Sequence, residues 1–285
     1  NVSYDMAVPY RVCGGLQDNG SWCGPSRRAD GGITNAHWAT FNGGDGFVTA
    51  QDPTNPDIVY GESQGGNIAR VNWRTGESTR LQKLQWRPRY TQWEDSILIA
   101  RPDTTSRATR EQAQRIENFR RQQRTDSTEM DVRWNWNTPF FLSPHNPSVF
   151  YAAGNRVFKS TARGDDMRPI SPDLSKRLMP QIDTSLNKTG GITPDATGAE
   201  AYGTIVSLNE SPLRPGILWA GTDDGNLWLS RTDGATWDQV RGPFPGLPDD
   251  RVYVSRIEPS QYDSATVYVS FDNHQEGDFT PYVFM

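Results

Sequence analysis

A short phrase that recurs four times along the chain constrains its fold more than any other feature. Each copy is a turn rich in Pro with Asp or Asn, followed by a strand that carries an aromatic residue. The copies are residues 52–60, 143–151, 211–219 and 258–268. A repeated unit buries its apolar faces only against its neighbours, so the repetition predicts a row of similar units packed side by side.

The second half of each unit also repeats, as a Gly-Asn turn followed by a short strand. Copies of this turn are Gly66-Asn67, Gly154-Asn155 and Gly225-Asn226. Alternation of apolar and polar residues after the turn is typical of a half-buried strand in a hairpin. The aromatic residues that end the four copies of the first phrase are Tyr60, Tyr151, Trp219 and Tyr268. They are separated by 91, 68 and 49 residues, which indicates a unit near the last length with insertions in the earlier ones.

Units of about 40 to 50 residues with several strands each predict the blades of a β-propeller. Composition favours the same fold, because 10 Trp, 26 Gly and 20 Pro supply an aromatic core and many turns. We therefore predict an all-β chain of repeated four-stranded blades over residues 1–285, with about five blades or part-blades visible. Since the chain begins and ends inside a repeat, we expect it to be part of a larger propeller.

Two insertions interrupt the repeats. Residues 84–131 contain the one predicted helix, over 107–124, which is rich in Arg, Gln, Glu and Ala and lacks Gly and Pro. Residues 176–202 show little periodicity and are predicted to be a long loop. The first insertion is therefore expected to be a helical insertion in an otherwise all-β fold.

Charge and motif content exclude several classes of function. The 29 basic and 34 acidic residues give a net charge of −5, so the chain has no overall electrostatic attraction for nucleic acid or an anionic membrane. The longest aliphatic run, residues 97–100, is far too short to span a bilayer. His37, His145 and His274 lack the spacing of metal ligands, and no phosphate-binding loop is present. We predict no metal and no cofactor.

Residues 230–237 resemble the Asp-box of BNR-type propellers, whose pattern is Ser-x-Asp-x-Gly-x-Thr-Trp. Ser230, Gly234 and Trp237 match the pattern, but the acid has moved one place to Asp233 and Thr232 stands at the third position. A side-chain oxygen there can accept hydrogen bonds from turn N–H groups, and Gly234 can take positive φ. We expect this motif to be structural.

A more degenerate copy of the Asp-box follows another repeat strand, at residues 160–167. Ser160 and Gly164 are retained, whereas Ala162 and Met167 replace the acid and the Trp. Its place directly after a repeat strand is the main reason to assign it the same structural role.

Several further phrases resemble the sortilin-like, BNR-repeat β-propellers of large secreted bacterial proteins. They are residues 14–21, 43–47, 60–67, 135–139 and 143–147. The resemblance implies the propeller fold, a longer chain with further blades, and a secreted, periplasmic or cell-surface location. Members of this group are often labelled glycosyl hydrolases, yet the Asp-box supplies no catalytic group.

Cys13 and Cys23 flank a predicted hairpin turn, and the extracytoplasmic setting that the resemblance implies favours a disulfide between them. A loop slightly wider than two residues would place them opposite each other. A two-residue Asn19-Gly20 turn would instead place Cys23 opposite Leu16. Both pairings are open at the level of the sequence.

The favoured functional hypothesis is a non-catalytic extracytoplasmic propeller that acts as a protein-interaction or scaffold module. Its partner would be another protein or the remaining blades of the same propeller. Trp86, Tyr90 and Trp93 cluster with Arg and Pro before the predicted helix, as residues do at interface hot spots. We therefore predict that they form the binding surface.

The alternative hypothesis is a glycoside hydrolase, sialidase-like or of another BNR type, or a carbohydrate-binding propeller. Hydrolysis needs two carboxylates that face one pocket, and Asp45 and Glu62 have small neighbours that leave room for a ligand. The acids of two other Gly-rich turns, Asp18 in one and Asp223 and Asp224 in the other, are predicted to serve those turns. A sialidase-like site would also need clustered Arg residues, which no sequence context marks.

Overall fold

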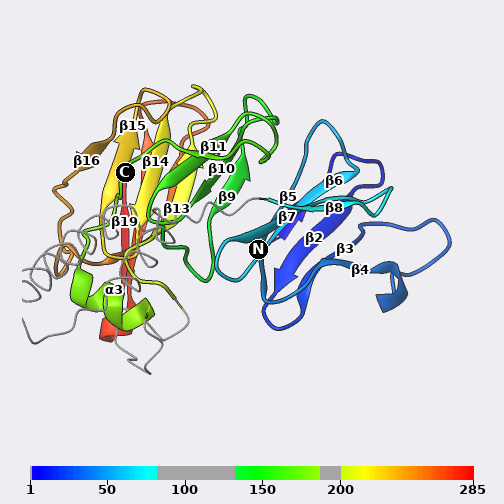
Figure 1. The fold of residues 1–285 in the computed structure, drawn as a ribbon, viewed down its shortest axis with the longest axis horizontal. Coiled ribbons are helices and arrows are strands. Elements are labelled where there is room, and N and C mark those ends of the chain that lie inside the picture. Colours follow the sequence, from blue (N-terminus) through cyan, green and yellow to red (C-terminus); the bar gives the residue numbers. More distant parts are fainter. Residues whose placement is uncertain (1, 82–131, 187–199) are drawn as a thin grey trace, which may run out of the picture. The chain divides into compact units, whose positions relative to one another are not determined.

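The computed structural model describes residues 2–81, 132–186 and 200–285. In these residues the chain forms five antiparallel sheets, one after another along the sequence, of which four have four strands and the last has three (Figure 1). In every sheet, strands adjacent in sequence are also adjacent in space. Consecutive meander sheets of this kind are the blades of a β-propeller, so the predicted fold class is confirmed.

We number the sheets blade 1 to blade 5 in chain order. Blade 1 contains β1 (Val2–Tyr4), β2 (Arg11–Leu16), β3 (Gly20–Pro25) and β4 (Ala39–Asn42), with the 3-10 helix η1 (Asn35–His37) before β4. Blade 2 contains β5 (Gly46–Gln51), β6 (Ile58–Ser63), β7 (Asn67–Asn72) and β8 (Ser78–Arg80). Blade 3 contains β9 (Phe140–Leu142), β10 (Phe150–Ala153), β11 (Val157–Ser160) and β12 (Arg168–Pro169).

The last two blades are separated from blade 3 by the helix α3 (Met179–Leu186). Blade 4 contains β13 (Ile205–Glu210), β14 (Leu218–Thr222), β15 (Leu227–Ser230) and β16 (Asp238–Val240). Blade 5 contains β17 (Tyr253–Pro259), β18 (Val267–Asn273) and β19 (Asp278–Phe284), with the 3-10 helix η2 (His274–Glu276) between the last two. In the part of the chain that is described, no helix is long and apolar enough to cross a membrane.

Of the two predicted insertions, the structure describes part of the second one only. Residues 84–131, with the predicted helix over 107–124 and the predicted binding residues Trp86, Tyr90 and Trp93, lie outside the described residues. The predicted loop 176–202 contains α3, so a loop alone was an incomplete prediction. Apolar contacts of one side chain hold α3 in place. Ile182 is 1% exposed and packs with Leu178, Met179 and Tyr202.

The recurring phrase of the sequence is the turn between the first and second strands of blades 2 to 5. The aromatic residue that ends it does not have one environment. Tyr60 and Tyr151 are 0% and 1% exposed, whereas Tyr268 is 46% exposed. The ring of Tyr60 stacks on that of Phe150 with centroids 5.5 Å apart, which joins blade 2 to blade 3.

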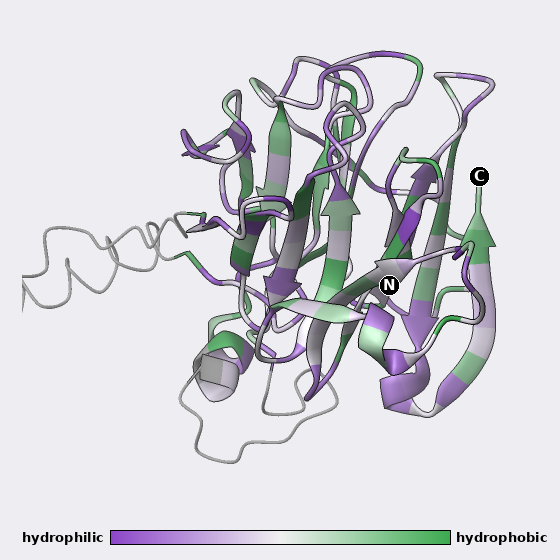
Figure 2. Cartoon of the chain, turned by 90° about the vertical axis from the view of Figure 1, so that its right-hand side faces the viewer, coloured by the Kyte–Doolittle hydropathy of each residue, from purple (hydrophilic) through white to green (hydrophobic). Residues whose placement is uncertain are grey.

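Apolar residues of adjacent blades pack against one another to form the core. Figure 2 shows hydrophobic and hydrophilic bands alternating along the strands, as the two-residue period of a strand requires. Leu208 and Leu218 of blade 4 share one cluster with Tyr151 of blade 3. Leu227 of blade 4 shares another with Val254 of blade 5. The core is therefore divided into layers between blades.

Two glycines permit backbone segments that are distant in sequence to approach closely. A Cβ atom at Gly15 of blade 1 would collide with the backbone of Phe47 in blade 2. One at Gly154 of blade 3 would collide with the carbonyl oxygen of Arg133. Gly15 lies in the phrase 14–21 and Gly154 lies in a repeated Gly-Asn turn, and the physical role of both is this contact.

The first hairpin resolves the alternatives for the cysteines. Cys13 lies opposite Cys23 and Leu16 lies opposite Gly20, so residues 17–19 form a three-residue turn. A disulfide joins the two cysteines, which are 2% and 1% exposed. The two-residue turn that would oppose Cys23 to Leu16 is not adopted.

Strand direction places one set of loops together. Because neighbouring strands are antiparallel, the turn between the second and third strands of a blade lies at the same end as the connection into the next blade. These turns are residues 17–19, 64–66, 154–156, 223–226 and 274–277. We call this the pocket end of the blades, and it carries the site described next.

Candidate functional site

Hydrogen bonds at the pocket end tie the turns of blades 1 to 3 together. The backbone N–H of Asp18 donates to Asp45 Oδ1 at 2.9 Å. The N–H of Asp45 donates to Gln64 Oε1 at 2.8 Å, and the N–H of Gly65 donates to the carbonyl oxygen of Trp136 at 3.0 Å. The turns are therefore fixed by contacts between blades.

The two acids proposed for hydrolysis belong to these turns. Asp45 holds the turn of Asp18, and Glu62 is fully buried and accepts a hydrogen bond from the N–H of Gly66 at 3.3 Å. Neither residue lines the pocket described below. Both carboxylates therefore accept hydrogen bonds from turns, and a catalytic role for Asp45 and Glu62 stays a prediction.

A pocket of about 430 Å³ lies at the pocket end and receives residues from all five blades or the connections into them. We call it the five-blade pocket. Its size lies within the range of small-molecule sites, about 300–1,000 Å³. It is lined by Gln17, Phe47, Asn135, Trp136, Asn137, Glu200, Asp223, Tyr253, Asp272, His274 and Gln275.

Three half-buried aromatic rings contribute apolar surface to the pocket: Phe47, Trp136 and Tyr253. The segment that carries Trp136 is held on both sides. Asn135 Nδ2 donates to Thr204 Oγ1 at 2.8 Å, and Asn135 Oδ1 accepts from the N–H of Asn137 at 3.2 Å. The indole is therefore presented from a fixed backbone rather than from a free loop.

Three carboxylates line the pocket together with Tyr253. They are Glu200, Asp223 and Asp272. Burial raises the pKa of Tyr253, and the charges of these three groups raise it further. Tyr253 therefore keeps its proton and remains a hydrogen-bond donor.

Asp223 is the most buried of these acids, at 8% exposed. Burial raises its pKa well above the ordinary value, and the charge of Asp224 adds to the effect. Thr204 opposes the shift, because its N–H donates to Asp223 Oδ1 at 2.8 Å and its hydroxyl donates to Oδ2 at 3.0 Å. The sequence assigned Asp223 to a turn, and the structure places it in that turn and in the pocket at once.

Asp272 has the opposite electrostatic environment. Burial alone would raise its pKa, but hydrogen bonds from His274 bring the pKa of Asp272 below the ordinary value. The backbone N–H of His274 lies 3.0 Å from Asp272 Oδ1, and its ring Nδ1 lies 2.7 Å from the same oxygen. The pocket thus contains one carboxyl group that favours the neutral form and one that favours the charged form.

Among the residues that the structure describes, those that line the pocket include no Lys or Arg. Its fixed charge is therefore negative, which disfavours an anionic ligand. Over the described residues, no group of three or more His, Cys, Asp or Glu is arranged to hold a metal ion. The arrangement suits a neutral, hydroxyl-rich molecule that presents an apolar face to the rings.

The Asp-box-like turn of blade 4 lies at the opposite end of the blade, between β15 and β16. Ser230 Oγ accepts hydrogen bonds from the N–H groups of Thr232 and Gly234, the latter at 2.9 Å, and Gly234 has φ of 86°. Asp233 does not serve this turn. Its carboxylate contacts the hydroxyl of Tyr151 at 3.2 Å and Lys159 Nζ.

Trp237 contacts the preceding blade connection, as its indole N–H donates to the carbonyl oxygen of Ile170 at 3.0 Å. The equivalent turn of blade 3 is built by a residue that the sequence pattern did not mark. Ser160 Oγ accepts from the N–H of Gly164 at 2.8 Å. Asp166 accepts from the N–H groups of Thr161 at 2.8 Å and Ala162 at 3.0 Å. The anchoring acid was therefore wrongly judged to be lost, because it stands four residues after Ala162.

Most residues of the pocket had no functional assignment from sequence, among them Trp136, Glu200, Tyr253, Asp272 and His274. Trp136 belongs to the phrase 135–139, so its position in a repeated phrase was the available signal. Glu200 comes from the connection into blade 4, and Tyr253, Asp272 and His274 come from blade 5, with no shared pattern. Only the meeting of separate blades brings them together.

Together these features define a β-propeller with a polar and aromatic pocket at the turn end of its blades. No protein-family model matches the chain, and no curated protein matches it. It is similar to the solved structure of a GH74 enzyme from Niastella koreensis, with 14% identity, a TM-score of 0.47, and coverage of 93% of this chain and 32% of that chain.

Two further solved structures are similar to a comparable degree. One is the GH74 xyloglucanase from Xanthomonas campestris, with 15% identity, a TM-score of 0.48, and coverage of 92% of this chain and 32% of that chain. The other is an auxiliary nutrient binding protein from Bacteroides thetaiotaomicron, with 9% identity, a TM-score of 0.47, and coverage of 96% and 55%. The chain spans about a third of the length of the two GH74 proteins. Similarities of this size carry no argument about the activity of this chain.

Proposed function

We propose that the chain is a carbohydrate-binding propeller module and that a neutral saccharide binds in the five-blade pocket. The observation that carries the proposal is that three aromatic rings and three carboxylates converge there, with no Lys or Arg among the described residues of the lining. The electron-rich face of an aromatic ring suits the C–H face of a sugar ring. Carboxylates, amides and the Tyr253 hydroxyl suit sugar hydroxyl groups.

The negative charge of the pocket also favours uncharged sugars over anionic ones. Sialic acids carry a carboxylate, and a site for them needs cationic side chains. The lining residues supply carboxylates instead. We therefore favour uncharged sugars over the sialidase-like ligand that the Asp-box alone suggests.

The setting of the module follows from two local features. A buried disulfide between Cys13 and Cys23 is typical of an oxidising compartment, so we place the module outside the cytoplasm. The serine-anchored turns of Ser160 and Ser230 support kinship with BNR-repeat, sortilin-like propellers. In this proposal the blades serve as a scaffold within a larger protein.

The test is a glycan array of neutral and anionic oligosaccharides, followed by calorimetry on the best ligand. Replacing Trp136 with Ala should weaken binding at least about tenfold, because a fixed aromatic ring dominates small binding sites. Tyr262→Ala is the matched control, since that ring is 94% exposed at the opposite end of blade 5. Binding only to anionic glycans, or equal loss with both variants, would refute the proposal.

Hydrolysis of a glycosidic bond is a second candidate function, favoured by one observation. Asp223 and Asp272 have pKa values shifted in opposite directions within one pocket, and such a division suits a general acid and its charged partner. Release of reducing ends from every saccharide that binds is the readout. Asp223→Asn and Asp272→Asn should each abolish it and Asp238→Asn should not, whereas binding without any release rejects this candidate.

A further inference from the structure

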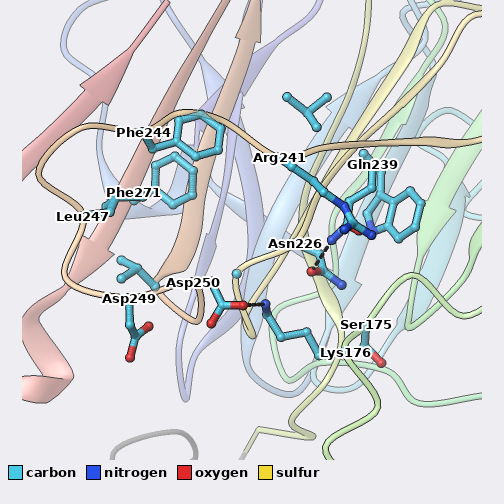
Figure 3. Close-up of a pocket in the computed structure, with 14 residues that line it drawn as sticks. Ser175, Lys176, Asn226, Gln239, Arg241, Phe244, Leu247, Asp249, Asp250 and Phe271 are labelled. Carbon is cyan, nitrogen blue, oxygen red and sulfur yellow. Dashed lines mark hydrogen bonds and ion pairs between the residues drawn. The ribbon is translucent and has the colours of Figure 1, made fainter.

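A second concavity lies between blades 4 and 5, and no residue that lines it lines the five-blade pocket. We call it the inter-blade cleft. It has a volume of about 630 Å³ and is shown in Figure 3. Phe244, Leu247 and Phe271 lie on one side, and Asn226, Gln239 and Arg241 lie on the other (Figure 3). The cleft therefore has an apolar wall facing a polar one.

The apolar wall is rigid because aromatic rings support it from behind. The ring of Phe244 lies 5.0 Å from that of Phe271 and 5.1 Å from that of Phe284. Leu247 packs on the same cluster. An apolar ligand group would meet a formed surface here and would not need to order a loose one.

The polar wall is a chain of hydrogen bonds that ends at Arg241. Gln239 Nε2 donates to Asn226 Oδ1 at 2.9 Å, and Arg241 Nε donates to Gln239 Oε1 at 3.0 Å. The guanidinium group is thereby oriented, while its two terminal nitrogens have no hydrogen-bond or ion-pair partner among the residues described. They form a ready donor pair for a carboxylate.

The remaining charges of the cleft compensate one another. Lys176 Nζ pairs with Asp250 Oδ2 at 2.7 Å (Figure 3). Asp249 pairs with Arg251 at 3.3 Å. Arg241 is therefore the lining cation without a carboxylate partner, and the cleft complements one negative charge beside an apolar group.

The backbone of blade 4 supplies a third element of recognition. β16 is the outermost strand of its sheet and pairs only with β15 there. Gln239 and Val240, the last two residues of β16, and the next residue, Arg241, all line the cleft. Consecutive side chains of a strand point to opposite faces, so the open edge of β16, rather than one face, borders the cleft.

We propose that the inter-blade cleft binds an extended peptide segment of a partner protein, which pairs with the edge of β16. An aromatic or branched aliphatic side chain of the segment packs on Phe244 and Leu247. A neighbouring carboxylate binds Arg241. Main-chain pairing gives affinity and the two side chains give specificity, as in other complexes formed by strand addition.

The experiment is selection of a random dodecapeptide library on the intact chain, followed by fluorescence polarisation with the selected peptide. We expect sequences in which Asp or Glu lies near Phe, Leu or Ile, with binding that weakens as salt increases. Arg241→Glu should weaken binding at least tenfold. Arg214→Glu, an exposed charge reversal in the β13–β14 loop of the same blade, should leave it unchanged.

Hydrogen exchange tests the pairing mode on the same complex. The peptide should slow exchange in residues 238–241 and leave the β13–β14 loop unchanged. Selection of basic peptides, no selection at all, or equal affinity for the Arg241 and Arg214 variants would overturn the proposal. Trp136→Ala should retain peptide binding, so failure here is distinguishable from failure of the saccharide proposal.

Discussion

Single side chains at the two ends of the blades have different tasks. At the pocket end, Asp223 and Asp272 are held by Thr204 and His274 in environments that shift their pKa values apart. At the opposite end, Asp166 accepts hydrogen bonds from the turn that follows β11. Residue type alone did not separate these roles, because all three residues are aspartates. Asp166 and Asp223 lie in turns, and Asp272 lies near the end of β18.

Replacing Asp166 with Ala should lower the free energy of unfolding by about 1 kcal/mol, the usual effect of losing a side-chain acceptor for turn N–H groups. The hydrogen bonds from Ser160 and Thr161 also hold the pKa of Asp166 below its ordinary value. Chemical denaturation measures the change. Asp238→Ala is the control, since Asp238 is exposed and has a single 3.5 Å ion pair. Equal stability of the two variants would contradict the assigned anchor.

Asp223 predicts a specific dependence of stability on pH. The pKa of Asp223 is raised in the folded state, so its charged form destabilises the fold. This destabilisation is absent below the unfolded pKa of about 3.9 and grows as pH rises. Asp223→Asn should therefore stabilise the chain more at pH 7.5 than at pH 4.5. The measurement is the difference in unfolding free energy at both values, and a difference that shrinks as pH rises would contradict the burial argument.

At the level of elements, the strands could be predicted because each repeat contains residues that favour turns, and these residues mark where its strands begin and end. Gly-Asn turns and Pro-rich turns marked the hairpins of blades 2 to 4 correctly. α3 was missed because its eight residues have apolar contacts only through Ile182 and its neighbours, and a single turn gives no visible period. The pocket could be predicted only in part, since Asp272 and Tyr253 acquire their neighbours from other blades.

The first hairpin provides a test at the level of one element. Cys13→Ser with Cys23→Ser should lower the free energy of unfolding by about 2–3 kcal/mol, because the disulfide closes a loop with a sequence separation of 10. Denaturation with and without reductant measures this. The stability of the double variant should not depend on the reductant. The reductant should lower the free energy of unfolding of the native chain toward that of the double variant. An unshifted native chain would show that the hairpin is stable without its crosslink.

In the compact unit of residues 1–83 and 133–285, stability depends on layers between blades. The same repeat position supplies a buried ring in blade 2 and an exposed ring in blade 5, Tyr60 and Tyr268. The sequence phrase predicts the strand, but the depth to which its aromatic ring is buried is decided by the side chains that the neighbouring blade packs against it. That depth depends on residues far apart along the chain, which is why the repeat alone could not reveal it.

Tyr60→Ala should destabilise the chain by about 3–5 kcal/mol, the usual cost of truncating a buried aromatic residue. It should also loosen blade 2 from blade 3, because the stack on Phe150 is lost. Tyr268→Ala, the equivalent exposed position, should change stability by no more than about 0.5 kcal/mol. Thermal unfolding followed by calorimetry compares the two, and similar losses would argue against stabilisation by inter-blade layers.

The convergence of five blades on one pocket has a consequence for engineering and for evolution. Turns and connections supply most of the lining, and the strand residues Phe47, Tyr253 and Asp272 lie at or next to the ends of their strands. A turn such as 17–19 or 274–277 can therefore be exchanged without repacking the layers that hold the fold. Ligand preference in such a scaffold can change one loop at a time, and the same blades can serve successive specificities.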